Sequence, residues 1–171
     1  MKEPIQAFDY AGHIVKQLSE GQVLLSTRAE KFNSMVIGWG HLGVIWNHPT
    51  FTVYVRQSRY TLSQLNSTGE FTISLPVEGR LDKEIFRVCG SLSGKDVDKE
   101  KAARLTLAEP EIIHTPGILE APLTLECRVL YRQDQALPCI PENLRERFYG
   151  DAGDFHTAYI GQIVSSYILR T

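Results

Sequence analysis

The stretch FTVYVRQSRYT, residues 51–61, contains the signals that decide the fold class. Phe51, Val53 and Val55 alternate with polar residues, which is the pattern of a strand with one buried face. The strand ends in two arginines that flank a glutamine and a serine. Directly afterwards, Thr61-Leu62-Ser63-Gln64 fits the S/T-x-x-E/Q capping box, so we predict that a short helix begins at Thr61.

The same two-residue period predicts strands in the segments 70–76 and 122–132. The segments 21–27 and 33–39 are predicted to pair as a hairpin. The segment 155–171 is long and rich in β-branched and aromatic residues, which predicts a strand with a bulge or bend at Gly161. Short helices are predicted at 82–89, 98–108 and 141–148. The pattern indicates one mainly β domain over residues 1–171, a barrel or sandwich, rather than βαβ units.

The composition excludes several function classes. The chain has 171 residues, 22% of them charged, and a formal net charge of −2, so nucleic acid and anionic membranes are not expected as partners. No apolar run is long enough to span a bilayer and the first residues lack the apolar core of a signal peptide, so a cytoplasmic location is expected. Cys89, Cys127 and Cys139 are scattered without metal-ligand spacing, and no metal site is predicted.

Residues 38–43 read GWGHLG, a literal G-x-G-x-x-G. A dinucleotide site of the Rossmann type would need a helix at the last glycine and an acidic residue about 20 positions later. The segment VIWNHP follows instead, and no acid occurs between Glu30 and Glu70. We therefore reject the Rossmann interpretation and expect a tight, irregular loop in which the backbone approaches something flat or bulky.

The acid-free stretch itself indicates an anion site. It contains Arg56, Ser58 and Arg59 where a strand gives way to the start of a helix. Guanidinium groups, free N–H groups and the positive end of a helix dipole together suit a phosphate, and a nearby carboxylate would weaken its binding. The alternative is that both arginines pair with surface acids. Ahead of the arginines in the sequence, Asn33 and Trp39 suit the binding of a planar heterocycle. The alternative is that Trp39 and Trp46 are core or interface aromatics, and for Trp46 this alternative is preferred.

Several motifs, in this order, resemble those of a known family. They are NSMVIGWG at 33–40, WNHP at 46–49, VYVRQSRYT at 53–61, CGSLSGKDVDK at 89–99 and GDFHTAYIGQI at 153–163. The pattern is similar to that of the flavin reductase-like proteins with the FMN-binding split-barrel fold, a family that includes flavoredoxin. The resemblance implies a homodimer of Greek-key split barrels of six or seven strands, with FMN held noncovalently near the dimer interface.

The resemblance also implies roles for individual residues. The phosphate would be bound by Arg56, Ser58, Arg59, Tyr60 and Thr61. The ring would be lined by the segment from Asn33 to Gly40, with Met35, Val36, Ile37, Gly38 and Trp39, largely through backbone groups. A second loop would supply Cys89, Gly90, Ser93, Gly94 and Lys99. His156 would lie near the flavin as the catalytic residue.

The sequence departs from the family pattern at three positions. Gln57 stands where a proline is common, Gln162 where a glutamate is usual, and Phe155 interrupts what is often Gly-Asp-His. The last two weaken the assignment of the C-terminal contacts. Cys89 has the alternative role of a small buried hydrophobe rather than a redox thiol, and His156 that of an ordinary strand histidine.

The sequence therefore leads to an FMN-dependent oxidoreductase as the first functional hypothesis. NAD(P)H would be the electron donor, and a flavin or an electron-transfer protein the acceptor. The alternative is an FMN-binding electron carrier that does not oxidise nicotinamide directly. A nucleic-acid-binding small barrel is a third class, which the net charge and the lack of a basic, aromatic sheet surface argue against.

Overall fold

The computed structural model describes residues 1–170. Its strands are β1 (Lys2–Pro4), β2 (Val23–Arg28), β3 (Phe32–Ile37), β4 (Gly40–Ile45), β5 (His48–Arg56), β6 (Glu70–Leu75), β7 (Leu107–Ala108), β8 (Gly117–Ile118), β9 (Leu123–Asp134) and β10 (His156–Leu169). Its helices are η1 (Ala7–Tyr10), α1 (Ala11–Ser19), α2 (Tyr60–Thr68), α3 (Lys83–Ser91), α4 (Lys99–Ala102), η2 (Leu137–Cys139) and α5 (Glu142–Phe148). Within residues 1–170, no helix is long and apolar enough to cross a membrane.

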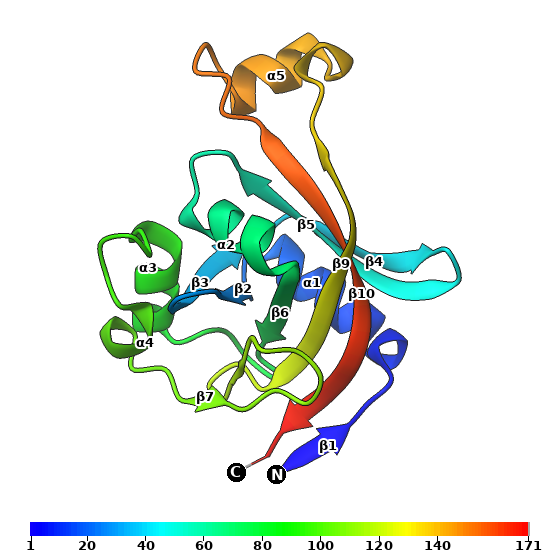
Figure 1. Cartoon of the computed structure of the whole chain (residues 1–171), viewed down its shortest axis with the longest axis vertical. Helices are drawn as coiled ribbons and strands as arrows, with labels where there is room; N and C mark the ends of the chain where they lie inside the picture. The colour runs from blue at the N-terminus through cyan, green and yellow to red at the C-terminus, as the bar shows by residue number, and fades with distance from the viewer. Residues whose placement is uncertain (171) are drawn as a thin grey trace.

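The main sheet is antiparallel and follows the order β3-β2-β6-β9-β10-β5-β4, with β1 added as an eighth strand alongside β10 (Figure 1). Its two ends, β3 and β4, are joined only by residues 38 and 39, yet no ladder pairs them within residues 1–170. The sheet must therefore curl until its ends meet, and it stays open along this seam. The prediction of a mainly β split barrel with a few short helices is confirmed.

Burial follows the two-residue period that the sequence predicts. Phe51, Val53 and Val55 of β5 are fully buried, whereas Tyr54 and Arg56 on the other face are half-buried. The buried face of β5 joins those of β2, β6 and β9 in a core cluster that fills the barrel. The hairpin of β2 and β3 is also confirmed, with Ser26 opposite Ser34. The barrel thus forms around the face that β5 shares with these strands, whereas Leu24 on the opposite face of β2 packs in a second apolar cluster.

The predicted irregularity at Gly161 is confirmed. The register between β10 and β9 shifts between Ile160 and Gly161. A Cβ atom at Gly161 would lie 2.5 Å from Cζ of Phe71 and 3.0 Å from Cβ of Cys127. The absence of a side chain here allows the long β10 strand to pack against the core aromatic.

We expect Gly161→Ala to lower the free energy of unfolding by about 1–3 kcal/mol, because the added methyl overpacks the barrel interior. Urea unfolding of the purified variant measures this loss. Gly43→Ala is the matched control, since a Cβ on that strand glycine meets no atom within 4 Å. Equal midpoints for Gly161→Ala and wild type would contradict the packing argument.

Two of the three predicted helices are confirmed and one is largely wrong. The segments 82–89 and 141–148 form α3 and α5, and the carboxylate of Asp82 accepts hydrogen bonds at the start of α3. The segment 98–108 forms only the short helix α4 and then turns at Arg104, whose φ is 52°. The chain turns there because Leu105 and Ala103 are buried in a second apolar cluster.

The glycine-rich segment 38–43 is not the irregular loop expected from the sequence. From Gly40 onward it forms β4, which pairs with β5 across a turn at Trp46 and Asn47, both with positive φ. A Cβ atom at Gly40 would lie 2.8 Å from the carbonyl oxygen of Thr52, so the close backbone approach is to the neighbouring strand. Trp46 is 59% exposed and is not a core residue.

The short helix predicted after β5 is confirmed as α2, but the capping box predicted at its start is wrong. Helix α2 begins at Tyr60, one residue earlier, with Arg59 in the N-cap position and no side-chain cap. Nδ2 of Asn33 donates to the Thr61 hydroxyl at 2.9 Å, and Nε2 of Gln64 donates to the Lys31 carbonyl at 2.9 Å. Both side chains therefore connect α2 to the β2–β3 hairpin, because the helix packs against that hairpin instead of standing free.

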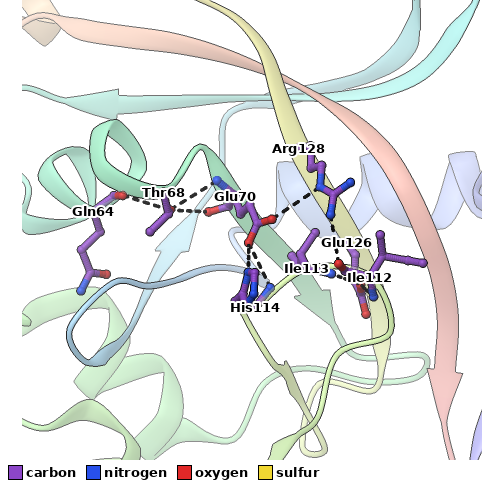
Figure 2. Close-up of polar contacts among 8 residues, drawn as sticks. All are labelled: Gln64, Thr68, Glu70, Ile112, Ile113, His114, Glu126 and Arg128. Carbon is purple, nitrogen blue, oxygen red and sulfur yellow. Dashed lines mark hydrogen bonds and ion pairs between the residues drawn. The ribbon is translucent and has the colours of Figure 1, made fainter.

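A buried carboxylate clamps the loop 109–116 to the sheet (Figure 2). Glu126 of β9 is fully buried and accepts from the backbone N–H groups of Glu111, Ile112 and Ile113, at 2.6, 2.8 and 3.2 Å. Its Oε1 also accepts from the hydroxyl of Tyr167 at 2.9 Å. The loop is therefore held by main-chain donors that converge on one side chain.

Strands β9 and β10 extend beyond the barrel and carry the arm, which we define as residues 135–155, with η2 and α5 (Figure 1). The arm lies above the end of β5, where the barrel seam also opens. The described residues contain no group of three or more His, Cys, Asp or Glu side chains that could hold a metal ion.

Candidate functional site

Two adjoining compartments lie at the barrel seam. The polar compartment is lined by Asn33, Met35, Val36, Ser58, Arg59, Tyr60, Thr61, Cys89, Gly90, Leu92, Ser93, Gly94 and Lys99. The flat compartment is lined by Met35, Val36, Ile37, Gly38, Trp39, Tyr54, Arg56, Arg59 and His156. Three residues are shared, so the two compartments form one continuous groove. The structure thus brings together every residue predicted for the site except Gly40, which lies in an adjoining hollow beside Trp39.

Two cations and no carboxylate line the polar compartment. Lys99 is only 3% exposed, and its Nζ donates to the carbonyl oxygens of Ser34 at 2.7 Å and Cys89 at 3.3 Å. Burial lowers the pKa of Lys99, and the positive charge of Arg59 lowers it further. The guanidinium of Arg59 makes no hydrogen bond or ion pair within residues 1–170. An anion in this compartment would offset the mutual repulsion of the two cations.

Asn33 and Gly94 shape the same compartment. Asn33 is 1% exposed, and its Oδ1 has no hydrogen-bond partner among the described residues. A Cβ atom at Gly94 would lie 2.1 Å from that oxygen, so only glycine fits there. A buried acceptor without a donor costs free energy unless a ligand supplies one. The amide of Asn33 therefore packs against the Gly94 backbone and forms part of the compartment wall.

Aromatic surfaces dominate one end of the flat compartment. The indole of Trp39 is 42% exposed and lies between the rings of Phe148 and His156, at centroid distances of 5.3 and 5.0 Å. The other wall is the edge strand β3, with Met35, Val36 and Ile37. An edge strand leaves N–H and C=O groups unpaired on one side. Such a surface suits a planar ring with polar edges.

Arg56 and Ser58 are engaged by the arm. The guanidinium of Arg56 donates to the carbonyl oxygens of Phe148 at 2.8 Å and Asp154 at 2.9 Å. The N–H and hydroxyl of Ser58 donate to the Asp154 carboxylate at 3.1 and 2.6 Å. Arg56 lines the flat compartment while its guanidinium binds the arm. Ser58 already binds a carboxylate of the protein itself, that of Asp154. Their assignment to a phosphate stays a prediction, as it does for Arg59, Tyr60 and Thr61.

Cys89 is a buried thiol rather than a reactive one. Its side chain is 2% exposed, and burial raises the pKa of the thiol despite the opposing effect of Lys99. A thiol with a raised pKa carries little thiolate and is a poor nucleophile. Cys89 therefore contributes to the polar compartment as a small apolar wall.

His156 begins β10 and is 6% exposed. Burial, together with the positive charges of Arg56 and Arg59 and partly opposed by the Asp154 carboxylate, lowers the pKa of His156 to about 4. The imidazole is therefore neutral at pH 7. Its Nδ1 lies 3.0 Å from the hydroxyl of Tyr149.

We expect the stability of the protein to fall as the pH drops from about 6.5 to about 4. The unfolded chain binds a proton on His156 throughout this window, whereas the folded chain does not, so acid favours unfolding. Urea midpoints of wild type and His156→Gln, measured between pH 4 and 8, test this, with His48→Gln as an exposed control. The decrease of the urea midpoint with falling pH should be smaller in His156→Gln than in wild type, and unchanged in His48→Gln. The same pH dependence in all three proteins would contradict the prediction.

Sequence reasoning missed four residues at or beside the groove: Tyr54, Leu92, Tyr149 and Gln135. The alternation in β5 could have identified Tyr54, because Tyr54 lies on the same face of the strand as Arg56. Tyr149 and Gln135 belong to the arm, whose path over the barrel has no signal in the sequence pattern.

Known proteins share this architecture. The flavoredoxin of Methanosarcina acetivorans is 28% identical, with a TM-score of 0.64 over 86% of this chain and 68% of its own. An FMN-binding domain of a flavin reductases-like enzyme from Shewanella baltica shares the fold, at 19% identity and a TM-score of 0.66, over 98% of this chain and 77% of its own. An uncharacterized protein of Archaeoglobus fulgidus is 30% identical over 141 residues, which are 82% of this chain and 68% of the relative.

A family model provides the assignment. The model described as the flavin reductase like domain matches residues 15–170. That range contains the whole barrel apart from β1, both compartments of the groove and the arm. The chain therefore belongs to the family of flavin reductase like domains.

Proposed function

We propose that the groove binds FMN and that the protein is an oxidoreductase, which passes electrons from NAD(P)H through the flavin to a flavin or protein acceptor. The observation that carries the proposal is the joining of an acid-free polar compartment, with Arg59 and Lys99, to a flat compartment beside Trp39. FMN has the matching shape, with a phosphate at one end and a planar ring at the other.

Each part of the polar compartment has a task in this proposal. Arg59 and Lys99 bind the phosphate, together with free N–H groups in the first turn of α2. Asn33 and Gly94 shape the wall beside the phosphate, where the missing side chain of Gly94 leaves room for the Asn33 amide. No carboxylate belongs to the lining, and the Asp154 carboxylate beside it is held by the N–H and hydroxyl of Ser58. These features fit the anionic tail of the molecule.

The flat compartment positions the ring. The flavin supplies the hydride and electron chemistry when bound. The chain contributes placement between the β3 edge and Trp39, and His156 faces the same space as a neutral imidazole. Tyr54 and Arg56 of β5 line the adjoining side of the same space.

Two measurements test the proposal. Titration of the purified protein with FMN, followed by quenching of flavin fluorescence, tests binding. Anaerobic addition of NADH or NADPH tests the reductase activity, through bleaching of the yellow colour. Absence of FMN binding at micromolar concentration would contradict the whole proposal, whereas binding without bleaching would contradict only the use of nicotinamide.

An electron carrier without direct nicotinamide oxidation is the second candidate. It is favoured by the similarity to the Methanosarcina acetivorans flavoredoxin at 28% identity. Stopped-flow reduction of the FMN-loaded protein by NADH, compared with reduction by a ferredoxin-type donor, separates the two. If the ferredoxin-type donor reduces the flavin and NADH does not, the protein is an electron carrier.

We also propose a homodimer formed through an exposed apolar patch on β4, β9 and the turn after β4. The patch contains Val44, Trp46, Leu130 and Tyr131, which are 65%, 59%, 40% and 43% exposed. The rings of Trp46 and Tyr131 lie 6.4 Å apart, so the turn after β4 meets β9 within the patch. Exposed apolar patches of this kind mark association surfaces.

We expect Trp46→Glu to convert the dimer into a monomer of 19.3 kDa, because a buried unpaired carboxylate opposes association. Size-exclusion chromatography with light scattering measures the mass. Phe86→Glu is the control, since Phe86 is 43% exposed on α3, outside the patch. A wild-type monomer, or a dimer that survives Trp46→Glu, would contradict this interface.

A further inference from the structure

Three residues that are brought together by the arm form a closed hydrogen-bond unit at the mouth of the flat compartment. Gln135 directly follows β9, Tyr149 directly follows α5 and His156 begins β10. Tyr149 and His156 are both buried, with 8% and 6% of their surfaces exposed. The rings of Tyr149 and His156 lie nearly perpendicular, with centroids 5.6 Å apart.

The direction of each hydrogen bond follows from its donors. The backbone N–H of His156 can only donate, and it points to Oε1 of Gln135 at 3.2 Å, so this atom is the amide oxygen. The hydroxyl of Tyr149 also lies 2.7 Å from Oε1 and donates its single proton there. With that proton committed, the Tyr149 oxygen accepts at its other contact, 3.0 Å from Nδ1 of His156. Nδ1 must therefore carry the ring proton.

The distances support this direction. A separation of 2.7 Å is the usual length of an O–H···O bond, and 3.0 Å is the usual length of an N–H···O bond. The opposite arrangement, in which Tyr149 donates to Nδ1, would leave the short contact between two oxygens without a proton. Arg56 further fixes Tyr149, because its guanidinium lies 5.4 Å from the centre of the phenol ring and donates to the carbonyl of Phe148.

We propose that Gln135 and Tyr149 are positioning residues that hold His156 in the Nδ1–H tautomer, so that Nε2 presents a hydrogen-bond acceptor to the flat compartment. Nε2 makes no hydrogen bond within residues 1–170, and His156 lines the compartment. The ligand class that it recognises is a planar molecule with an N–H donor at its edge, such as a ring imide or a carboxamide.

The ligand class rests on the proposed function, whereas the tautomer does not. The charged groups around the imidazole are Arg56 on β5, Arg59 at the start of α2 and Asp154 in the arm. The two cations oppose a second proton on the ring. A neutral ring with one fixed acceptor is therefore the form that a ligand meets at pH 7.

Long-range ¹H–¹⁵N correlation spectra of the ¹⁵N-histidine-labelled, flavin-free protein at pH 7 test the tautomer. We expect His156 to show a protonated Nδ1 and an unprotonated Nε2. Tyr149→Phe, which removes only the hydroxyl, should shift the tautomer ratio toward Nε2–H by about tenfold, the effect of losing one buried hydrogen bond. Gln135→Leu should shift it in the same direction, because the Tyr149 proton is then free for Nδ1.

Tyr10→Phe is the control, since Tyr10 lies in η1 near the N-terminus, remote in sequence from the unit. The experiment requires folded protein only, and far-UV circular dichroism verifies the fold of each variant. An Nε2–H or doubly protonated His156 in wild type would overturn the proposal, as would an unchanged ratio in both Tyr149→Phe and Gln135→Leu. Because no flavin is present, neither result depends on whether the protein is an FMN oxidoreductase.

Discussion

Replacing Arg59 by alanine should raise the dissociation constant for FMN by about 100-fold while leaving the affinity for riboflavin within about threefold of wild type. The guanidinium lines both compartments and makes no competing hydrogen bond or ion pair within the described part of the chain. A charge-assisted hydrogen bond to an ionised group is worth about 1.5–3 kcal/mol, which is the size of this loss. Riboflavin lacks the phosphate, so it does not depend on Arg59.

Isothermal titration calorimetry with both flavins measures the two constants. Arg87→Ala is the matched control, because Arg87 is exposed on α3 and pairs with Glu84 outside the groove. We expect a loss of affinity for FMN alone, and only in Arg59→Ala. An equal loss for FMN and riboflavin would place Arg59 at the ring, and no loss would exclude it from the site.

Glu126→Gln should lower the free energy of unfolding by about 3 kcal/mol or more, which is a large share of the stability of a domain of this size. The carboxylate accepts from three backbone N–H groups and one hydroxyl while fully buried. An amide in its place offers one oxygen and turns an NH₂ group toward donors. At least one buried N–H group is then left without a partner.

Urea unfolding measures the loss, and hydrogen exchange locates it. The amides of residues 111–113 should exchange faster in Glu126→Gln, since they no longer have a fixed acceptor. Glu120→Gln is the control, because Glu120 also accepts from a backbone N–H, that of Thr106, but in an exposed position. Comparable losses in the two variants would mean that burial does not strengthen the clamp.

The parts of the fold that sequence predicts are those governed by local periodicity. Alternation in β5 follows from one-sided burial, and the bulge at Gly161 follows from a glycine in a long strand. The failures occur where tertiary contacts override local signals. Thr61 and Gln64 match a cap but bond to Asn33 and Lys31, and the helical residues after Ala102 turn to bury Leu105.

The same distinction applies to the groove. The absence of acids between residues 31 and 69 predicts an anion compartment, and Arg59 and Lys99 line one. The tie of Arg56 to the carbonyls of Phe148 and Asp154 was not predictable, because nothing in the sequence pattern shows that the arm folds back over β5. Main-chain acceptors have no signature in the side-chain sequence.

The open seam of the barrel has an evolutionary consequence. Because β3 is an edge strand with no neighbour on the side of the groove, a ring placed there meets peptide groups, which every amino acid possesses. Recognition by peptide groups tolerates replacement of the half-buried side chains of Met35 and Val36, whereas Ile37 is fixed by the core. Distant members of such a lineage can thus diverge at these two positions while they retain the same binding surface, and mutational scanning should find them more permissive than Gly94.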